Sequence, residues 1–141
     1  MRIEHSACST SQFCAAALGA KPGDRVLDVC AAPGGKTFTV AEIMENRGEV
    51  VACDLHAKRA KLVKTGGERL GLGIITARAN DATVYDESFG KFDKVLCDVP
   101  CSGLGVIRRK PEIRFKKPED LQSLPNIQYR IAAASAKYLK E

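Results

Sequence analysis

Short apolar runs alternate with amphipathic segments through most of the chain. Four runs have the length and apolar character of buried strands, and they cover residues 25–30, 49–54, 74–79 and 94–98. Between the first three runs, apolar residues recur at helical spacing over residues 36–45 and 56–70, and Gly71 follows the second segment as a stop. Apolar strands that alternate with helices are typical of a parallel sheet with both faces covered, so the pattern predicts an α/β fold.

Two more helices are expected at the ends of this alternation. One covers residues 9–18, ahead of the first strand. The other covers about 119–140, where Ile127, Ile131 and Tyr138 share one face and Pro125 lies in or before the first turn. The length of 141 residues suits one domain. Its predicted parts are the N-terminal helix, a core at about 24–104, a loop at about 105–118 and the C-terminal helix.

The composition narrows the class of protein. Hydrophobic residues make up 45% of the chain and charged residues 28%, which is typical of a folded globular protein. No apolar run approaches the ~20 residues of a membrane-spanning helix, and no secretory signal is recognised, so we expect a cytoplasmic protein without membrane contact. The six cysteines include no Cys-x-x-Cys pair, and the two histidines are far from zinc-ligand spacing, so we predict free thiols and no metal site. The net charge of +5 mildly favours a polyanionic partner.

A carboxylate stands at or just beyond the end of each predicted strand, and the four are Asp28, Asp54, Asp81 and Asp98. Ligands of open parallel sheets bind beyond the carboxyl ends of the strands, so these acids are candidate ligand contacts. Asp54 follows Asp28 at about the separation between a glycine-rich loop and a ribose-binding acid in nucleotide folds. Its alternative role is to cap the next helix.

The loop after the first strand restricts the ligand further. Residues 30–37 read CAAPGGKT and nearly meet the phosphate-loop signature, but Cys30 stands where the first glycine is required. The dinucleotide fingerprint G-x-G-x-x-G is absent, because Gly34 and Gly35 are adjacent. The remaining interpretation is an adenosyl ligand without a pyrophosphate, which is S-adenosylmethionine.

Three segments together carry a specific resemblance. They are CAAPGGKT at residues 30–37, DVPCSG at 98–103 and GVIRRKPEI at 105–113. From about residue 20 onward the chain resembles RNA cytosine-5 methyltransferases of the Nop/Sun family, above all the Sun (Fmu) type that acts on small-subunit ribosomal RNA. The resemblance implies a Rossmann-like S-adenosylmethionine-dependent methyltransferase fold, with a truncated parallel sheet in the order 3-2-1-4 and helices on both faces.

The resemblance also implies roles for individual residues. The family's loop for the methionine part of the cofactor matches Cys30, Ala31, Ala32, Pro33, Gly34, Gly35 and Lys36. Asp54 matches the acid on the ribose hydroxyls, Asp81 the acid beside the adenine, and Arg59 a frequent basic position on the cofactor side. Asp98 matches the acid that contacts both the cofactor side and the target cytosine, where we expect a general acid. Its alternative role is to fix the loop geometry. Cys101 matches the family's Pro-Cys thiol, an accessory catalytic residue that resolves the covalent adduct.

A basic run follows the DVPCSG segment and holds six cations: Arg108, Arg109, Lys110, Arg114, Lys116 and Lys117. Its plain interpretation is a solvated loop. Beside the site implied by the resemblance, we predict instead that it contacts RNA phosphates, with ribosomal RNA as the partner.

Two departures from the family pattern shape the functional expectation. The N-terminal residues lack the family's Gln-Asp-x-x-Ser pattern. Family members also continue beyond the residue that matches Glu141 into a strand and a segment with the attacking cysteine, so we expect a central, inactive fragment whose sheet edge favours self-association. Two other classes stay open: an inactive methyltransferase-like module that binds RNA, and a nucleotide-binding oxidoreductase.

Overall fold

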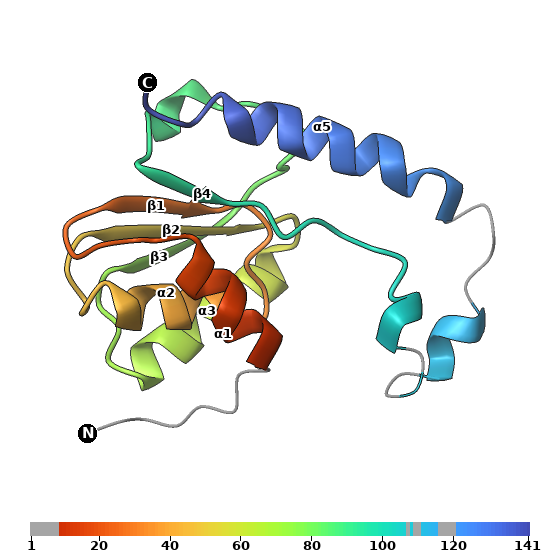
Figure 1. Cartoon of the computed structure of the whole chain (residues 1–141), viewed down its shortest axis with the longest axis horizontal. Coiled ribbons are helices and arrows are strands. Elements are labelled where there is room, and N and C mark those ends of the chain that lie inside the picture. Colours follow the sequence, from red (N-terminus) through yellow and green to blue (C-terminus); the bar gives the residue numbers. More distant parts are fainter. Residues whose placement is uncertain (1–8, 107, 109–110, 116–120) are drawn as a thin grey trace.

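The computed structural model describes residues 9–106, 108, 111–115 and 121–141. In this part of the chain, parallel strands form one sheet (Figure 1). The strands are β1 (Arg25–Asp28), β2 (Glu49–Asp54), β3 (Ile75–Ala79) and β4 (Lys94–Leu96). Their order, β3-β2-β1-β4, is the predicted one, which confirms the α/β class.

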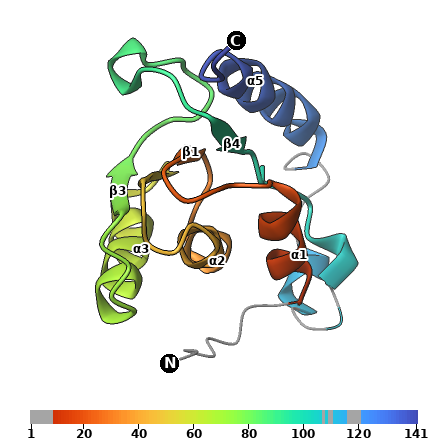
Figure 2. The same ribbon diagram turned by 60° about the vertical axis from the view of Figure 1, so that its left-hand side comes forward.

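The helices lie on both faces of the sheet, as predicted (Figure 2). The described elements are α1 (Ser9–Ala17), α2 (Gly35–Ile43), α3 (Ala57–Arg69) and α5 (Leu124–Ala136), with short 3-10 turns η1 (Glu87–Phe89), η2 (Leu104–Val106) and η3 (Pro111–Phe115). Helices α1, α2 and α3 cover one face, and α5 covers the other.

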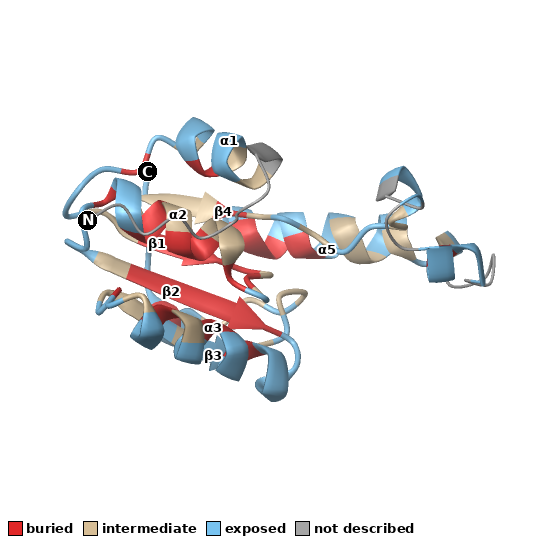
Figure 3. Ribbon diagram, turned by 90° about the horizontal axis from the view of Figure 1, so that it is seen from below, coloured by how far each residue is buried: buried red, intermediate tan, exposed pale blue. Residues whose placement is uncertain are grey.

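The strand sequences explain this two-sided core. Successive side chains of a strand point to opposite faces, so a strand that is apolar at every position requires cover on both. In β2, Val50 packs with the α2 and α3 side, whereas Val51 packs with Ile131 and Tyr138 on the α5 side. Figure 3 shows β2 buried along most of its length.

Several element boundaries differ from the sequence-based ones by one to a few residues. Strands β1 and β4 end at Asp28 and Leu96, two residues before the predicted ends, because the chain turns there into the loops of the carboxyl edge. Helix α5 begins at Leu124 with a proline in its first turn, where the missing amide costs no hydrogen bond. Of the predicted start of this helix, residues 119–120 lie outside the described residues.

The outer edge of β4 begins with a pairing from within the chain. The Phe92 amide donates to the Tyr138 carbonyl at 2.8 Å, and the Lys140 amide donates to the Phe92 carbonyl at 3.0 Å. Phe92 and Leu139 thereby form a parallel bridge. Part of the edge expected to be open is therefore covered, and self-association through the remainder stays a prediction.

A single aromatic ring fixes the contact between α2 and α3. A Cβ atom added at Gly34 or at Gly66 would lie less than 3.0 Å from the nearest carbon of the Phe38 ring. Gly34 begins the approach to α2, and Gly66 lies within α3. Both glycines are thus required by the close approach of this ring.

No helix in the described residues is both long and apolar enough to cross a membrane.

Candidate functional site

The carboxyl edge of the sheet brings the loop at residues 30–36 together with two of the predicted acids, Asp54 and Asp98. The Lys36 ammonium lies 2.7 Å from the Asp98 carboxylate. The Arg59 guanidinium donates to the Ala32 carbonyl at 3.1 Å and lies 3.5 Å from the Asp54 carboxylate. These contacts join segments that follow β1, β2 and β4 into one cluster.

The loop itself is a tight turn between β1 and α2. The Ala31 amide donates to the Cys53 carbonyl at 2.7 Å, which ties the loop to the end of β2. The Gly34 amide donates back to the Ala31 carbonyl at 2.8 Å across the cis Ala32–Pro33 bond. Gly34 has a φ of 113°, a region that favours glycine, so the residue is required both by its backbone and by the Phe38 ring. At Gly35 there is open space where a Cβ would be, which leaves the backbone accessible to a ligand.

A buried hydrogen bond supports this turn from below. The Thr37 hydroxyl donates to Asp28 Oδ2 at 2.7 Å, and both residues are buried. Asp28 Oδ1 is also buried and has no hydrogen-bond partner within the described residues. Burial raises the pKa of Asp28 to about 6, against the opposing effect of the Thr37 hydrogen bond. The sequence marked Asp28 as a strand-end acid, but its partnership with Thr37 was not predicted.

Asp54 occupies the end of β2 and is 4% exposed. Its Oδ1 accepts the His56 amide at 3.1 Å, and Arg59 flanks Oδ2. Asp54 fills its alternative role as a helix cap only in part. The amide that it accepts belongs to His56, the residue before α3, rather than to the first turn of the helix. The carboxylate therefore keeps acceptor capacity for a diol.

Asp81 lies two residues beyond β3, next to Asn80, whose amide donates to the Asp54 carbonyl at 2.9 Å. Asp81 Oδ1 accepts hydrogen bonds from the Thr83 amide at 2.9 Å and from the Thr83 hydroxyl at 2.7 Å. These hydrogen bonds lower the pKa of Asp81. The Arg130 guanidinium of α5 lies 3.4 Å from the same hydroxyl. Sequence analysis did not identify Thr83 or Arg130, because no local pattern links α5 to this loop.

Asp98 lies two residues beyond β4, and 54% of its side chain is exposed. Partial burial lowers the pKa of Lys36, but the hydrogen bond to Asp98 and the charge of that carboxylate raise it more, so the net effect is a raised pKa. The loop that continues from Asp98 is held by Gln128 of α5, whose amide donates to the Pro100 carbonyl at 2.7 Å. Gln128 is a second α5 contact that local sequence patterns do not signal.

The described cysteines differ sharply in accessibility. Cys101 is exposed, whereas Cys53 is buried and Cys14, Cys30 and Cys97 are intermediate. Burial raises the pKa values of the Cys30 and Cys53 thiols to about 12, so both remain neutral at physiological pH. Among these thiols, Cys101 is the one offered to solvent beside the site.

The predicted RNA-contacting loop is described only in part. Arg108 and Arg114 are exposed, and Arg109, Lys110, Lys116 and Lys117 lie outside the described residues. Ile113, 8% exposed, packs so closely on Gly103 that a Cβ there would lie 3.0 Å from its Cδ1. This contact holds η3, and with it Arg114, against the DVPCSG segment.

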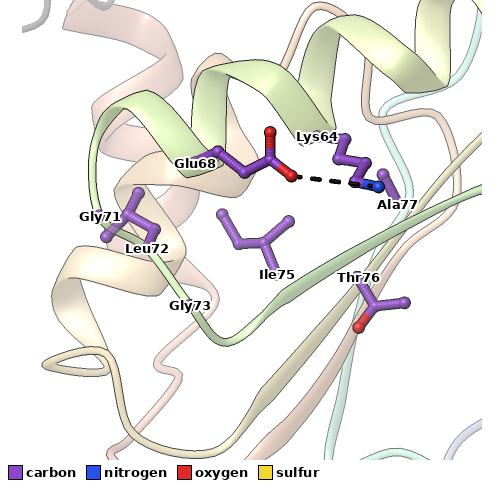
Figure 4. Close-up of a pocket in the computed structure, with 8 residues that line it drawn as sticks. All are labelled: Lys64, Glu68, Gly71, Leu72, Gly73, Ile75, Thr76 and Ala77. Carbon is purple, nitrogen blue, oxygen red and sulfur yellow. Dashed lines mark ion pairs between the residues drawn. The ribbon is translucent and has the colours of Figure 1, made fainter.

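A pocket on the molecule lies away from all of these residues (Figure 4). It opens between α3 and the outer side of β3, where Lys64 and Glu68 form an ion pair of 4.0 Å above Leu72 and Ile75. It contains none of the predicted site residues. We therefore place the candidate site by the clustered acids and the glycine turn rather than by this hollow.

The residues present at the carboxyl edge fit S-adenosylmethionine. Asp54 and Asp98 lie beside the turn and are paired with Arg59 and Lys36, so these cations are already neutralised and offer no excess positive charge to a pyrophosphate. S-adenosylmethionine instead carries a cationic sulfonium and an ammonium, together with a ribose diol for a carboxylate such as Asp54. This electrostatic balance disfavours the nucleotide-binding oxidoreductase interpretation.

Comparisons with known proteins match the chain to methyltransferases. Residues 15–141 match the family described as "16S rRNA methyltransferase RsmB/F". The chain is 47% identical over 135 residues to the "Probable ribosomal RNA small subunit methyltransferase B" of Bacillus subtilis, covering 94% of this chain and 30% of the relative. It is 40% identical over 113 residues to a mouse "28S rRNA (cytosine-C(5))-methyltransferase", covering 79% of this chain and 14% of that protein.

A solved structure gives the same result in three dimensions. "NSun6 from Pyrococcus horikoshii with SFG" superposes with a TM-score of 0.82 at 31% identity, over 92% of this chain and 33% of that one. The chain thus spans about a third or less of the length of these relatives. The matches confirm the Rossmann-like methyltransferase fold and S-adenosylmethionine as the cofactor expected from the sequence. The chain belongs to the 16S rRNA methyltransferase RsmB/F family.

Proposed function

We propose that an enzyme containing this chain transfers a methyl group from S-adenosylmethionine to C5 of a cytosine in small-subunit ribosomal RNA, in the cytoplasm. The observation that carries the proposal is the 2.7 Å contact between Lys36 and Asp98. It joins the loop matched to the cofactor with the segment matched to the target base. The relatives named for ribosomal RNA methylation support the choice of substrate.

In this proposal the chain's residues hold the cofactor along the carboxyl edge. The turn at residues 30–36 receives the methionine part, Asp54 accepts the ribose hydroxyls, and Asp81 lies beside the adenine. Leu55 follows Asp54 directly and is 61% exposed, so it offers an apolar surface for the adenine ring. When bound, S-adenosylmethionine supplies an electrophilic methyl group on its sulfonium sulfur.

The target base requires activation, because C5 of cytosine is a weak nucleophile. A thiolate that adds at C6 makes C5 nucleophilic, and the base must leave its stack to meet that thiolate. Asp98 keeps half of its side chain exposed beside Lys36, so its carboxyl group, when protonated, can donate to N3 as the thiolate adds at C6. After methyl transfer, loss of the C5 proton lets the thiolate leave C6 and restores the aromatic base. Lys36 holds this carboxylate in position.

We assign Cys101 an accessory role in the same reaction. Its thiol is exposed on the loop held by Gln128, three residues after Asp98, which suits a group that acts on an adduct already formed. The attacking thiol is then a different cysteine.

Two measurements test the proposal. Isothermal titration calorimetry on the chain should show S-adenosylmethionine binding, with no comparable affinity for ATP or NAD. The complete enzyme should transfer labelled methyl groups to small-subunit ribosomal RNA, and Asp98→Asn should abolish transfer while cofactor binding persists. RNA binding without any transfer would instead identify an inactive RNA-binding module, and binding of a nicotinamide nucleotide would identify an oxidoreductase.

A further inference from the structure

One helix carries an excess of positive charge that the cofactor site does not use. Helix α3 has the sequence AKRAKLVKTGGER, with five cations and one carboxylate. The formal net charge of this helix is +4, similar to that of the basic run at residues 108–117, which has six cations and one carboxylate. This local excess of positive charge attracts a polyanion that approaches the molecule.

The cations of α3 fall into two groups with different surroundings. Arg59 contacts Asp54 and the Ala32 carbonyl, and Lys64 pairs with Glu68 beside the pocket of Figure 4. Lys58, Lys61 and Arg69 are exposed and have no ion-pair partner among the described residues. Surface cations elsewhere are commonly engaged, as Arg47 is with Glu45 and Lys140 with Asp93.

The three unpaired cations lie on one line along the helix. Ala60, Val63 and Gly67 face the sheet, and at 3.6 residues per turn the opposite face is formed by Lys58, Lys61, Thr65 and Arg69. Figure 3 shows α3 exposed on the side turned away from the sheet. We call Lys58, Lys61 and Arg69 the α3 basic stripe.

The helix accepts these charges at some cost to its own stability. Cations at a helix N-terminus oppose the helix dipole, and Lys58 and Lys61 lie in the first turn and a half. The first turn of α3 contains no acidic residue, and His56 provides no side-chain cap. Helix stability therefore does not account for the placement of these lysines.

The stripe begins at the proposed site and runs away from it. The start of α3 is tied to the site by the His56 amide on Asp54 and by Arg59 on the cofactor loop. The segment with η2 and η3 lies on the other side of the molecule, beyond α1 and α2 (Figure 2). An RNA whose target base enters the site would pass one of these basic segments on each side.

We propose that the α3 basic stripe binds the sugar-phosphate backbone of the RNA substrate on the side of the site opposite η2 and η3. The inference rests on the proposed function, which supplies the polyanion. Lys58 and Lys61 are three residues apart, about 5–6 Å on a helix surface, and Arg69 lies eight residues beyond Lys61, a rise of about 12 Å. Cations at these spacings can contact phosphates along an RNA backbone without reading bases.

The test compares two variants of equal net charge. The stripe variant carries Lys58→Gln, Lys61→Gln and Arg69→Gln. The control variant carries Lys21→Gln, Arg47→Gln and Lys91→Gln, three exposed cations in the turns that precede β1, β2 and β4 at the opposite edge of the sheet. Affinity of the chain for a fluorescein-labelled single-stranded RNA is measured by anisotropy across a salt series, and S-adenosylmethionine affinity is measured by calorimetry.

We expect the stripe variant to lose roughly tenfold or more in RNA affinity at about 0.1 M salt, with a log–log salt slope shallower by about 0.7 for each lost phosphate contact. The control variant should keep most of the wild-type slope, and both should bind S-adenosylmethionine like the wild type. Equal losses of affinity and parallel salt slopes in the two variants would overturn the proposal. It would also be overturned if the stripe variant kept the full RNA affinity of the wild type, or if the wild type bound no RNA. Failure of the proposed function would appear separately, if the wild-type chain does not bind S-adenosylmethionine or if the complete enzyme does not transfer methyl groups.

Discussion

Lys36 and Asp98 lie 62 residues apart in the sequence, yet the lysine ammonium and the carboxylate meet at 2.7 Å. Lys36 lies in the first turn of α2, which follows β1, and Asp98 lies in the loop that follows β4; these two strands are neighbours in the sheet. The parallel register therefore places the cofactor segment and the base-contacting segment side by side.

This ion pair should matter for the site and little for the stability of the fold. The two side chains are 23% and 54% exposed, so solvent screens their attraction. A double-mutant cycle with Lys36→Met and Asp98→Asn, followed by urea unfolding, should give a coupling free energy below about 1 kcal/mol. A markedly larger coupling would show that the pair is a structural element.

Replacement of Asp54 should weaken cofactor binding. Asp54→Ala leaves the ribose hydroxyls without an acceptor, which should cost about 1–3 kcal/mol of binding free energy. Calorimetry with S-adenosylmethionine measures this loss, and Glu87→Ala, in the exposed first turn of η1, is the matched control. Equal affinities of wild type and Asp54→Ala would refute the ribose assignment.

Asp28 should make the stability of the chain depend on pH. Its pKa is raised from 3.8 to about 6 by burial, so the folded state binds the proton more tightly than the unfolded state. Stability contributed by the protonated form is then lost as the pH rises from about 4 to above 6, by roughly 3 kcal/mol in total.

The Asp28→Asn variant removes this titration. The free energy of unfolding of Asp28→Asn minus that of the wild type should therefore increase between pH 4 and pH 7. Urea denaturation at several pH values measures the difference, which cancels the contributions of other acids such as Asp81 and Asp93. A difference that stays constant with pH would contradict the buried, raised-pKa carboxyl.

Arg108 and Arg114 should contribute to RNA binding through charge alone. Changing both to Gln should reduce affinity for unrelated RNA sequences alike and make the log–log salt slope shallower by about 0.7 per lost contact. Filter binding on two RNAs of different sequence measures both effects. If neither quantity changes, the two arginines are merely solvated.

Cys101 should be dispensable for formation of the covalent adduct. With a 5-fluorocytosine RNA and S-adenosylmethionine, the complete enzyme should form a covalent adduct that persists in Cys101→Ala. An adduct formed by the chain and lost in Cys101→Ser would make Cys101 the attacking thiol. Electrophoresis under denaturing conditions separates these results.

The sheet was predictable because its strands are apolar at nearly every position. A run such as residues 49–54 fits one environment, a strand covered on both faces, and the motif at residues 30–37 then fixes where the ligand lies. Strand order followed from the family resemblance rather than from hydrophobic pattern, because the pattern carries no information about neighbours across the sheet.

The contacts made by α5 were beyond prediction from sequence. Gln128 and Arg130 look like ordinary solvent-facing residues of an amphipathic helix, and only the packing of Ile131 and Tyr138 on the sheet aims them at Pro100 and Thr83. The buried bond between Asp28 and Thr37 was missed for a similar reason. Its two residues belong to different elements, and the orientation of each is set by the turn between them.

The Phe38 ring has a consequence for how two ligands would act together. Because it touches both Gly34 in the cofactor turn and Gly66 in α3, it works as a rigid spacer between them. A displacement of α3 by RNA would be passed to the turn, and closure of the turn on its ligand would be passed to α3. Such coupling is reciprocal, so S-adenosylmethionine would change RNA affinity by the same factor by which RNA changes the affinity for S-adenosylmethionine. Replacing the ring by a smaller side chain in Phe38→Leu should bring that factor toward one. Titrations with S-adenosylmethionine and with RNA, each done with and without the other ligand, would measure it.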